Sequence, residues 1–480
     1  MIYSGIFEPL RVVTGLALLL SSLLAFAAAP FDKNPFPSTY APPDSPDTAI
    51  IGATILTGDG AQLAPGYVVI RGGRITAMGE GSLPAAEKDI SRVIDGNGRW
   101  LTPGIIDVHS HLGNYAAPDY AATSDGNEAT APVTAQVWTE HSVWPQDPQF
   151  PLALAGGVTT LQILPGSANL IGGRSVVLKN VSSRTVQGMK FPDAPYGLKM
   201  ACGENPKRVY GEKGGPATRM GNVAGYRAAW IKAAAYKEKW EKYDSEMIAF
   251  NAAKTKKSRK QDEAEAKAPT APERDLEMDT LRGVLDGEIL VHNHCYRADE
   301  MAQMIDVSKE FGYQITSFQH AVESYKIADL LAENGICSAM WADWTRFKLE
   351  SFDGIDENIA LVDRAKACAI VHSDSPWGIQ RLNQEAAKAM AAGKRMGMAI
   401  SGAHAMQWLT LNAARSLGID DQTGSVSVNK MADLVLWSGD PFSVYSRPEK
   451  VMIDGVLLLD EATGLKPVTD FELGLRVKTL

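Results

Sequence analysis

The stretch Leu101-Thr-Pro-Gly-Ile-Ile-Asp-Val-His-Ser-His-Leu112 carries the strongest signal for how this chain folds. A Pro-Gly turn precedes an apolar, β-branched run, and that run ends on His109 and His111. Residues i and i+2 of a strand point to the same side, so both imidazoles leave the strand together at its carboxyl end. Barrels and open parallel sheets carry their ligands at that end. The pair is either half of a metal site or two hydrogen-bonded strand histidines, and this stretch alone favours neither.

The composition is that of an ordinary globular protein. The chain has 480 residues, of which 45% are hydrophobic and 21% charged, which is enough for a large core and more than one domain. The formal net charge is −9, without the excess of basic residues that is typical of nucleic-acid-binding proteins, so we expect no nucleic-acid partner. The four cysteines (Cys202, Cys295, Cys337 and Cys368) are far apart and form no Cys-x-x-Cys pair. We interpret them as buried free thiols.

The amino terminus has the pattern of a secretory signal peptide. Arg11 precedes an apolar run over 12–29, and Ala25-Phe-Ala27 matches the small-x-small cleavage pattern. Residues 1–27 are therefore predicted to be removed, and residues 28–46, rich in Pro, Ser and Asp, to form a flexible leader. We expect a periplasmic or secreted protein with no stable membrane insertion after cleavage. A retained anchor is the alternative, although it usually needs about 20 continuous apolar residues.

The rest of the chain predicts an α/β protein with a (β/α)8 TIM barrel and a small composite β-sandwich. Residues 47–101 and 418–480 both show short alternating strands separated by turns, so we expect the two segments to form the sandwich together. Between them, over 102–417, short apolar runs alternate with helix-like segments. With the run before His109 they make eight strands, the number in such a barrel. The other seven runs cover 158–164, 175–178, 198–202, 288–292, 314–319, 336–340 and 369–371.

One connection, at about 225–272, is predicted to be a helical insertion. Apolar residues from Ala229 to Phe250 recur at spacings of four and three, with Lys and Glu between them, which is typical of an amphipathic helix. A basic cluster, an acidic patch and an Ala-Pro-rich segment follow. The insertion is either a solvated helical hairpin or a coiled-coil contact within a homo-oligomer.

Residues with metal-ligand chemistry end several of the predicted strands. Glu204 follows the fourth strand, His292 and His294 the fifth, His320 the sixth and Asp374 the eighth. Because the carboxyl ends of barrel strands meet on one rim, we expect these side chains to converge with the two histidines of the first strand. Their joint placement favours a metal site over structural histidines.

This arrangement resembles the metal-dependent amidohydrolase superfamily, in particular its imidazolonepropionase- and prolidase-like branch. The resemblance extends over nearly all of the mature chain, in the family's order, and includes the composite sandwich. The matching pieces are Pro103-Gly-Ile-Ile-Asp-Val-His-Ser-His111, Gly156-Gly-Val-Thr-Thr160, Val291-His-Asn-His294, Phe318-Gln-His320, Ser373-Asp374, Leu411-Asn-Ala-Ala-Arg415 and Lys430-Met-Ala-Asp-Leu-Val-Leu436.

The resemblance implies a ligand set. His109, His111 and Asp374 would bind the more buried metal, and His320, with a histidine of the fifth strand, would bind a second metal or polarise the substrate carbonyl. His292 lies where relatives place that ligand, so we favour it and expect His294 near the substrate.

The fourth strand departs from many relatives, which carry a carboxylated lysine there that bridges two metals. Here Glu204 stands at the strand end, and we predict that it is the bridge. A single metal, with Glu204 orienting one of its ligands, is the alternative. Histidines and carboxylates suit Zn²⁺ best, although Mn²⁺, Fe²⁺ or Co²⁺ also fit such ligands.

The implied function is hydrolysis of an amide-type C–N bond in a small molecule: a dipeptide, an N-acyl amino acid or a cyclic amide. A metal-activated hydroxide would attack the carbonyl, with Asp374 and His320 as the catalytic residues. Arg219 and Arg297 either clamp a substrate carboxylate or form surface ion pairs, and His372 is expected deeper in the barrel. A deaminase acting on a ring amidine is one alternative function. An inactive binding protein is another, which the filled ligand positions disfavour.

Overall fold

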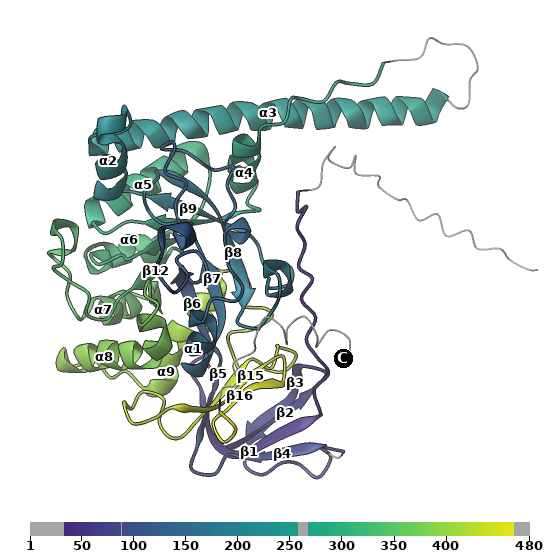
Figure 1. The fold of residues 1–480 in the computed structure, drawn as a ribbon, viewed down its shortest axis with the longest axis vertical. Coiled ribbons are helices and arrows are strands. Elements are labelled where there is room, and N and C mark those ends of the chain that lie inside the picture. The colour runs from purple at the N-terminus through teal and green to yellow at the C-terminus, as the bar shows by residue number, and fades with distance from the viewer. Residues whose placement is uncertain (1–32, 88, 258–266, 465–480) are drawn as a thin grey trace, which may run out of the picture. The chain divides into compact units, whose positions relative to one another are not determined.

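The computed structural model describes residues 33–87, 89–257 and 267–464 (Figure 1). The predicted signal peptide lies outside the described residues. The chain divides into two compact units. One comprises Phe36–Lys239 and Glu273–Leu480, and the other Met1–Pro35 and Trp240–Pro272.

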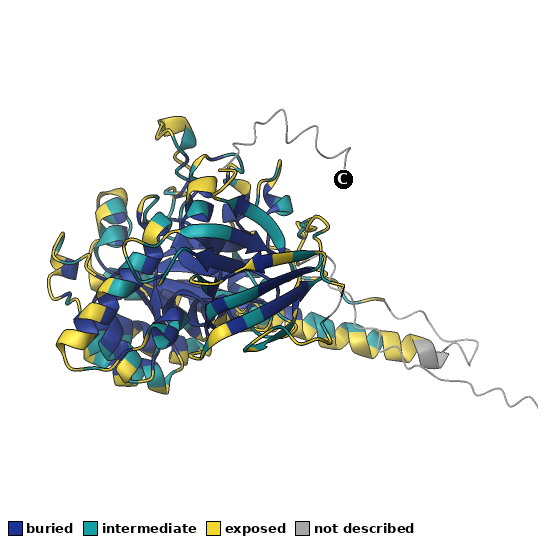
Figure 2. Cartoon of the chain, turned by 90° about the horizontal axis from the view of Figure 1, so that it is seen from below, coloured by how far each residue is buried: buried dark blue, intermediate teal, exposed yellow. Residues whose placement is uncertain are grey.

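The larger unit contains an eight-stranded sheet whose strands follow one another in chain order from β6 to β13. Nearly every residue in these strands is buried, as expected for a barrel whose outside is covered by helices (Figure 2). All eight predicted strands are present. They are β6 (Ile105–Ser110), β7 (Val158–Ile163), β8 (Ile171–Lys179), β9 (Gly197–Ala201), β10 (Leu290–His294), β11 (Ile315–Gln319), β12 (Cys337–Met340) and β13 (Cys368–Val371).

One strand breaks the parallel pattern. β8 runs antiparallel to both β7 and β9, whereas the other neighbouring strands pair in parallel. Only residues 164–170 connect β7 to β8, and a parallel return needs a crossover of about a dozen residues or more. The expected strand-helix alternation is therefore wrong at this point of the barrel.

Helices follow most of the other barrel strands. Figure 1 shows α5, α6, α7 and α8 side by side along one side of the barrel sheet. The helices of the larger unit are α1 (Gln149–Ala155), α2 (Glu204–Tyr210), α4 (Leu276–Leu285), α5 (Ala298–Phe311), α6 (Ala328–Glu333), α7 (Asn358–Arg364), α8 (Leu382–Arg395), α9 (Gly402–Met406) and α10 (Leu411–Ser416).

Among its described residues, the predicted insertion contains one long helix, α3 (Arg219–Lys257), of 39 residues. Its apolar positions are buried in the first half, where Ala229, Trp230 and Ala233 are at most 5% exposed. Further along, Tyr243, Met247 and Phe250 are half-buried. The helix thus confirms the predicted periodicity, while its role in an oligomer stays a prediction.

Both ends of the chain contribute strands to a second sheet. Its hydrogen-bonded order is β16-β15-β14-β5-β1-β2-β3, with β4 paired to β1, and Ile50, Leu101 and Leu434 belong to its core. The terminal segments therefore combine as expected. The hydrogen bonds define one continuous sheet, so a sandwich stays a prediction. The strands are β1 (Thr48–Leu56), β2 (Gln62–Arg71), β3 (Arg74–Glu80), β4 (Arg92–Asp95), β5 (Trp100–Pro103), β14 (Leu434–Trp437), β15 (Pro448–Ile453) and β16 (Val456–Asp460).

A buried ion-pair network joins this sheet to the barrel. Lys179, the last residue of β8, is fully buried, and its Nζ lies 2.7 Å from Asp454 Oδ2 and 3.4 Å from Asp433 Oδ1. Tyr40 donates a hydrogen bond to the same Asp454 oxygen. Because a buried charge without a partner is costly, this network holds the segments at the two ends of the chain against the barrel.

The expectation of four free thiols is wrong, because the structure pairs all of them. Cys202 is bonded to Cys295 and Cys337 to Cys368, with Cα–Cα distances of 5.2 and 4.3 Å. Each pair belongs to two neighbouring strands or to the residues that follow them. Separation along the sequence does not reveal this proximity, since closing the barrel creates it.

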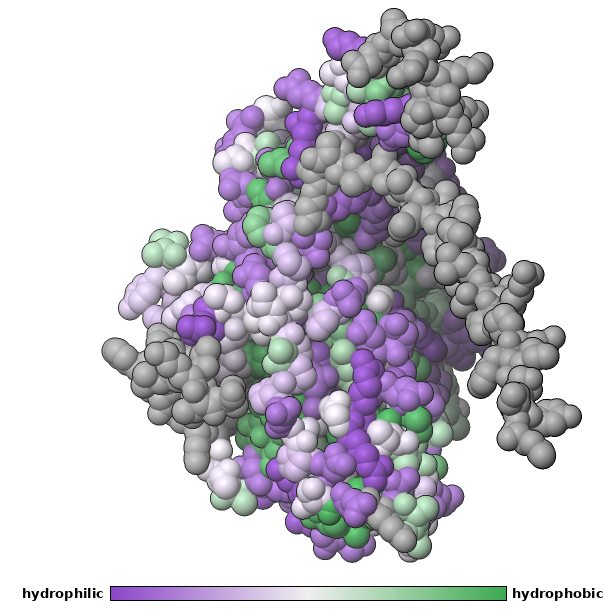
Figure 3. All heavy atoms as spheres, turned by 90° about the vertical axis from the view of Figure 1, so that its right-hand side faces the viewer, coloured by the Kyte–Doolittle hydropathy of each residue, from purple (hydrophilic) through white to green (hydrophobic). Residues whose placement is uncertain are grey.

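Hydrophilic residues are spread over the face of the molecule shown in Figure 3, with smaller hydrophobic patches between them. Among the described residues, no helix combines the length and apolar character that crossing a bilayer requires.

Candidate metal centre

His109, His111 and Asp374 converge at the rim of the barrel. His111 Nε2 lies 3.2 Å from Asp374 Oδ1, and His109 Nε2 lies 3.6 Å from the same oxygen. The two histidines are on β6, and Asp374 follows β13, at the other end of the strand order. The backbone N–H of Asp374 donates to the His109 carbonyl oxygen at 3.0 Å and so brings the two ends of the barrel sheet together. The structure thus groups three predicted ligands.

Hydrogen bonds orient both imidazoles so that the Nε2 atoms face the shared space. His111 Nδ1 lies 2.9 Å from the Leu164 carbonyl oxygen and donates to it, since a carbonyl only accepts. His109 Nδ1 lies 3.2 Å from Gln319 Oε1, while Gln319 Nε2 donates to Ser317 Oγ at 2.8 Å. In this tautomer each Nε2 keeps a free lone pair, as a metal ligand requires.

His320 joins the group from the end of β11. Its Nε2 lies 3.7 Å from Asp374 Oδ2, and its ring centroid is 4.3 Å from that of His109. His320 and Asp374 have φ angles of +59° and +49°, which are uncommon for residues with a side chain. Such conformations concentrate at functional sites, where the surrounding structure holds them in place.

His372, which was expected deeper in the barrel, is buried and contacts this cluster. Its Nε2 is 2.7 Å from His320 Nδ1, and His109, His320 and His372 form a second group able to hold an ion. The hydrogen bond leaves the Nε2 of His320 directed at Asp374. His372 thereby orients His320.

On the fifth barrel strand, the structure reverses the preference for His292. His294 lies in the cluster, with its ring centroid 4.8 Å from that of His320, and neither of its ring nitrogens has a hydrogen-bond partner among the described residues. His292 lies two residues deeper: its Nδ1 bonds Ser317 Oγ at 2.9 Å, and a Cβ on Gly197 would be 2.6 Å from its Cδ2. Both histidines face the barrel interior, but only His294 reaches the rim.

Lys199 is a site residue that the sequence interpretation missed. It lies in the middle of β9, is 1% exposed, and its Nζ is 3.3 Å from His109 Nε2 and 3.0 Å from the Pro165 carbonyl oxygen. Burial lowers its pKa to about 7. The sequence did contain an indication of this residue, a lysine inside the short apolar run Gly197-Leu-Lys-Met-Ala201. A lysine seldom occurs in a fully buried strand without a specific role.

The structure does not bring Glu204 into the cluster. Glu204 is the first residue of α2, where its backbone N–H donates to Glu350 Oε1 at 2.5 Å and its Oε1 lies 3.6 Å from Lys348 Nζ. Neither ion-binding group found among the described residues includes it. The chain turns into the helix shortly after the strand and leaves this carboxylate in an ion pair with Lys348, which gives no support to Glu204 as a bridging ligand.

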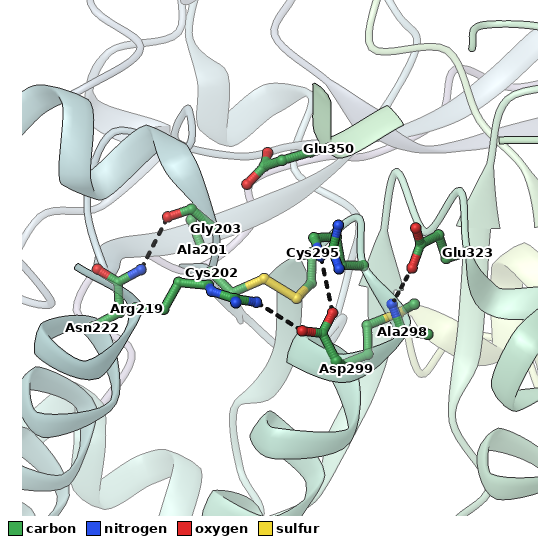
Figure 4. Close-up of a disulfide and its surroundings, with 12 residues drawn as sticks. Ala201, Cys202, Gly203, Arg219, Asn222, Cys295, Ala298, Asp299, Glu323 and Glu350 are labelled. Carbon is green, nitrogen blue, oxygen red and sulfur yellow. Dashed lines mark hydrogen bonds and ion pairs between the residues drawn. A yellow bond between two sulfur atoms is a disulfide. The ribbon is translucent and has the colours of Figure 1, made fainter. Parts of the chain in front are cut away.

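The two predicted substrate clamps form surface ion pairs instead. Arg219 Nη1 lies 2.7 Å from Asp299 Oδ2, and Arg297 Nε lies 3.0 Å from Asp299 Oδ1. Figure 4 shows Arg219 and Asp299 beside the Cys202–Cys295 disulfide. All three charged side chains are more than a third exposed, so the structure gives no support to a role in substrate binding.

Burial keeps His109, His294 and His320 neutral, which is the form that binds metals. Desolvation, followed by the charge of Lys199, lowers the pKa of both His109 and His294 well below the usual range. Desolvation and the neighbouring His109 do the same for His320. Beneath them, burial raises the pKa of Asp107 to about 7, although the Ser373 hydroxyl donates a hydrogen bond to its carboxyl group.

These residues fit a divalent metal ion. The ligand atoms of His109, His111 and Asp374 lie within 4.8 Å of one another, and both ring nitrogens of His294 are buried without a hydrogen-bond partner among the described residues. Buried polar atoms normally have partners, and unsatisfied ones point to a missing ligand or ion. Neutral imidazoles and a carboxylate are the ligands of zinc and related transition metals.

Comparisons of sequence agree with this geometry. The Amidohydrolase family model matches residues 100–458. The amidohydrolase tasK of Hapsidospora irregularis is 31% identical over 421 residues, which cover 82% of this chain and 40% of that protein. An imidazolonepropionase from a Bradyrhizobium species is 34% identical over 115 residues, covering 21% of this chain and 28% of that protein. The chain thus spans two fifths or less of the length of these two relatives.

Solved structures show the same fold. An amidohydrolase from Thermotoga maritima MSB8 has 34% sequence identity and a TM-score of 0.72, covering 86% of this chain and all of the other. An adenosine deaminase from Xanthomonas campestris, solved with bound zinc, has 17% identity and a TM-score of 0.51 over 91% of this chain and 98% of its own. The second likeness concerns the fold alone. On the family match, which includes every residue of the histidine cluster, the chain belongs to the Amidohydrolase family.

Proposed function

We propose that this chain is a metal-dependent hydrolase that cleaves an amide-type C–N bond in a dipeptide, an N-acyl amino acid or a cyclic amide. The observation that carries the proposal is the convergence of His109, His111 and Asp374, with both imidazoles held so that Nε2 is free to bind a metal. When bound, a divalent ion such as Zn²⁺ lowers the pKa of a water molecule to roughly 7 and so supplies hydroxide near neutral pH.

The side chains around the metal position would supply the proton transfer and the polarisation of the substrate. Asp374 lies within 4 Å of His109, His111 and His320, so its carboxylate is placed to accept a proton from the attacking water and deliver it to the leaving nitrogen. His320, oriented by His372, and the neighbouring His294 face the same space. They would hold a second metal or polarise the substrate carbonyl.

Lys199, rather than Glu204, fits the role of a ligand that bridges two metal ions. With a pKa near 7, a large fraction of its amine is neutral at physiological pH and can add to carbon dioxide. The balanced step is R–NH₂ + CO₂ → R–NH–COO⁻ + H⁺, in which an N–C bond forms and one proton leaves. The new carboxylate would lie beside His109 Nε2, where relatives carry a carboxylated lysine.

The test is to load the purified mature protein with Zn²⁺ and to screen it against dipeptides, N-acyl amino acids and cyclic amides. We expect one to two metal equivalents and an activity that chelation abolishes. His111→Ala should lose metal, and Asp374→Asn should lose turnover. The matched control is His404→Ala. His404 forms a hydrogen bond with Asp363 on α7 and lies far along the chain from the residues of the histidine cluster. Full activity in a metal-free protein would overturn the proposal, and release of ammonia from a ring amidine would redirect it to deamination.

We also propose that the protein is exported to the periplasm or beyond. The signal-peptide pattern of residues 1–27 supports this location, as do the two disulfides, which persist in oxidising compartments. N-terminal sequencing of the protein from a fractionated host should find a mature start near Ala28. A chain that starts at Met1 in the membrane pellet would argue for an anchor.

A further inference from the structure

An aromatic cluster begins directly on the site histidines. The Trp341 ring stacks on His320, with a centroid distance of 4.5 Å and an interplanar angle of 24°. Trp341 is held there because its Nε1 donates to the Ser373 carbonyl oxygen at 2.9 Å. Tyr296 contacts the same group, with ring centroids 5.0 Å from His294 and 5.7 Å from His320.

The cluster continues outward to solvent. Trp344 stacks on Trp341 at 5.2 Å, and Phe347 lies 6.0 Å from Trp341 and 6.3 Å from Tyr296. We call these four residues the aromatic wall. Exposure rises along it, from 5% at Tyr296 and 8% at Trp341 to 38% at Trp344 and 57% at Phe347. Large apolar side chains that stay exposed beside a catalytic centre indicate a surface built to be covered by a ligand.

Several of the charged side chains around the aromatic wall are paired with one another. Lys348 Nζ lies 3.8 Å from the Tyr296 ring centroid, but it is paired with Glu350 Oε2 at 3.0 Å and Glu204 Oε1 at 3.6 Å. One positive charge is thus set against two negative ones. Among the described residues, the neighbouring guanidinium groups of Arg219 and Arg297 are already paired with Asp299. Arg346, between Trp344 and Phe347 in the sequence, is exposed and has no ion pair among the described residues, so the wall is an apolar surface with one available cation adjacent to it in the sequence.

We infer that the aromatic wall selects substrates in which one group flanking the scissile bond is bulky, apolar and preferably aromatic. The inference rests on the proposed function, because the scissile carbonyl must reach Asp374 and His320 while its flanking group lies on Trp341, Trp344 and Phe347. Offset-stacked and edge-to-face ring contacts favour an aromatic group over an aliphatic one of similar size.

The experiment uses the full mature chain loaded with Zn²⁺ and a matched series of small amides. Phenylalanine, alanine and aspartate side chains are placed in turn on the acyl side and on the amine side of the scissile bond. At one of the two positions, kcat/KM should be at least about 10-fold higher for phenylalanine than for either alanine or aspartate. No preference at either position would overturn the inference while leaving the proposed function standing. No hydrolysis of any member by the metal-loaded protein would overturn both.

Substitutions then test whether the aromatic wall carries the preference. Trp344→Ala and Phe347→Ala, separately and together, should lower the ratio of kcat/KM for phenylalanine over alanine towards one, with the metal content unchanged. Trp344→Phe should retain most of the ratio, which separates loss of the ring from misfolding. Tyr445→Ala is the control, since Tyr445 is an aromatic residue 90% exposed in the turn before β15. A phenylalanine preference that survives the double substitution would refute the assignment.

Discussion

Lys199 Nζ lies 3.3 Å from His109 Nε2 inside the barrel, and the two side chains are 1% and 0% exposed. A protonated lysine would donate to the lone pair that a metal needs on His109. Metal binding and a charged Lys199 therefore exclude each other, whereas a carboxylated Lys199 would add a ligand at this position.

Replacing Lys199 by Ala should reduce the metal content to one equivalent or less and lower kcat by more than about 100-fold, since it removes a direct ligand rather than a supporting contact. Metal analysis and turnover measure both effects. Formate or propionate should restore part of the activity by filling the vacated space, and a carbamate carbon signal from ¹³C-bicarbonate should be present only with Lys199. The control is Lys309→Ala, because Lys309 is an exposed lysine on α5. A variant of Lys199 that keeps two metals and full turnover would exclude the bridge.

Replacing Glu204 by Gln should have little effect on metal content. The carboxylate is paired with Lys348 at the rim and is about a third exposed, so its loss removes a partly screened ion pair worth about 1 kcal/mol or less. We expect two-fold to ten-fold changes in KM, from the altered charge beside the aromatic wall, and an unchanged metal stoichiometry. Loss of one metal equivalent would restore Glu204 as a ligand.

The two disulfides should differ in their effect on the metal. Cys202 directly follows β9, and Cys295 directly follows β10 and its last residue, His294. This disulfide therefore links the ends of two neighbouring strands at the rim (Figure 4). Cys337 and Cys368 are the first residues of β12 and β13, at the opposite end of the barrel. Replacing Cys202 and Cys295 by Ala should therefore weaken metal binding about 10-fold, as expected when the support of a ligand is lost.

The matched control replaces Cys337 and Cys368 by Ala. Loop closure over 93 and 31 residues predicts losses of about 4.7 and about 3.7 kcal/mol in the free energy of unfolding for the two double variants. Both variants should thus unfold more easily, but only the rim variant should bind metal more weakly. Calorimetric unfolding and metal titration separate the two effects, and equal metal affinities would rule out a positioning role.

Glu300 should make stability depend on pH. It is 4% exposed, and its Oε2 has no hydrogen-bond partner among the described residues. Burial, followed by the charge of Glu350, raises its pKa from 4.5 to about 7. The folded state therefore holds this proton more tightly than the unfolded state. The stabilisation is complete below pH 4.5 and is lost as the pH rises through 7.

Glu300→Gln removes that dependence, because glutamine stays neutral. Denaturant unfolding at pH 8 should find the variant more stable than the parent by up to about 3 kcal/mol, with the difference disappearing near pH 4.5. Glu333→Gln, at an exposed position on α6, should show no such trend. A Glu300 variant that is less stable at pH 8 would mean that the carboxylate has a favourable partner in the charged form.

The sequence by itself determined the features that depend on local periodicity. Apolar runs bounded by turns predicted all eight barrel strands, and the spacing of His109 and His111 placed both imidazoles on one side because side chains alternate along a strand. The sequence indicated His320 and Asp374 because each lies within three residues of the end of a buried strand, and strand ends of a barrel share one rim.

Only the tertiary structure decided the contacts that depend on neighbouring strands. His292 and His294 face the same side, so the depth of each in the barrel depends on how β9 and β11 are staggered beside β10. The same stagger places Lys199 against His109, whereas the turn into α2 carries Glu204 away to Lys348. The cysteine pairs likewise follow from closing the barrel. Residues far apart along the chain become neighbours there, and no local pattern encodes that proximity.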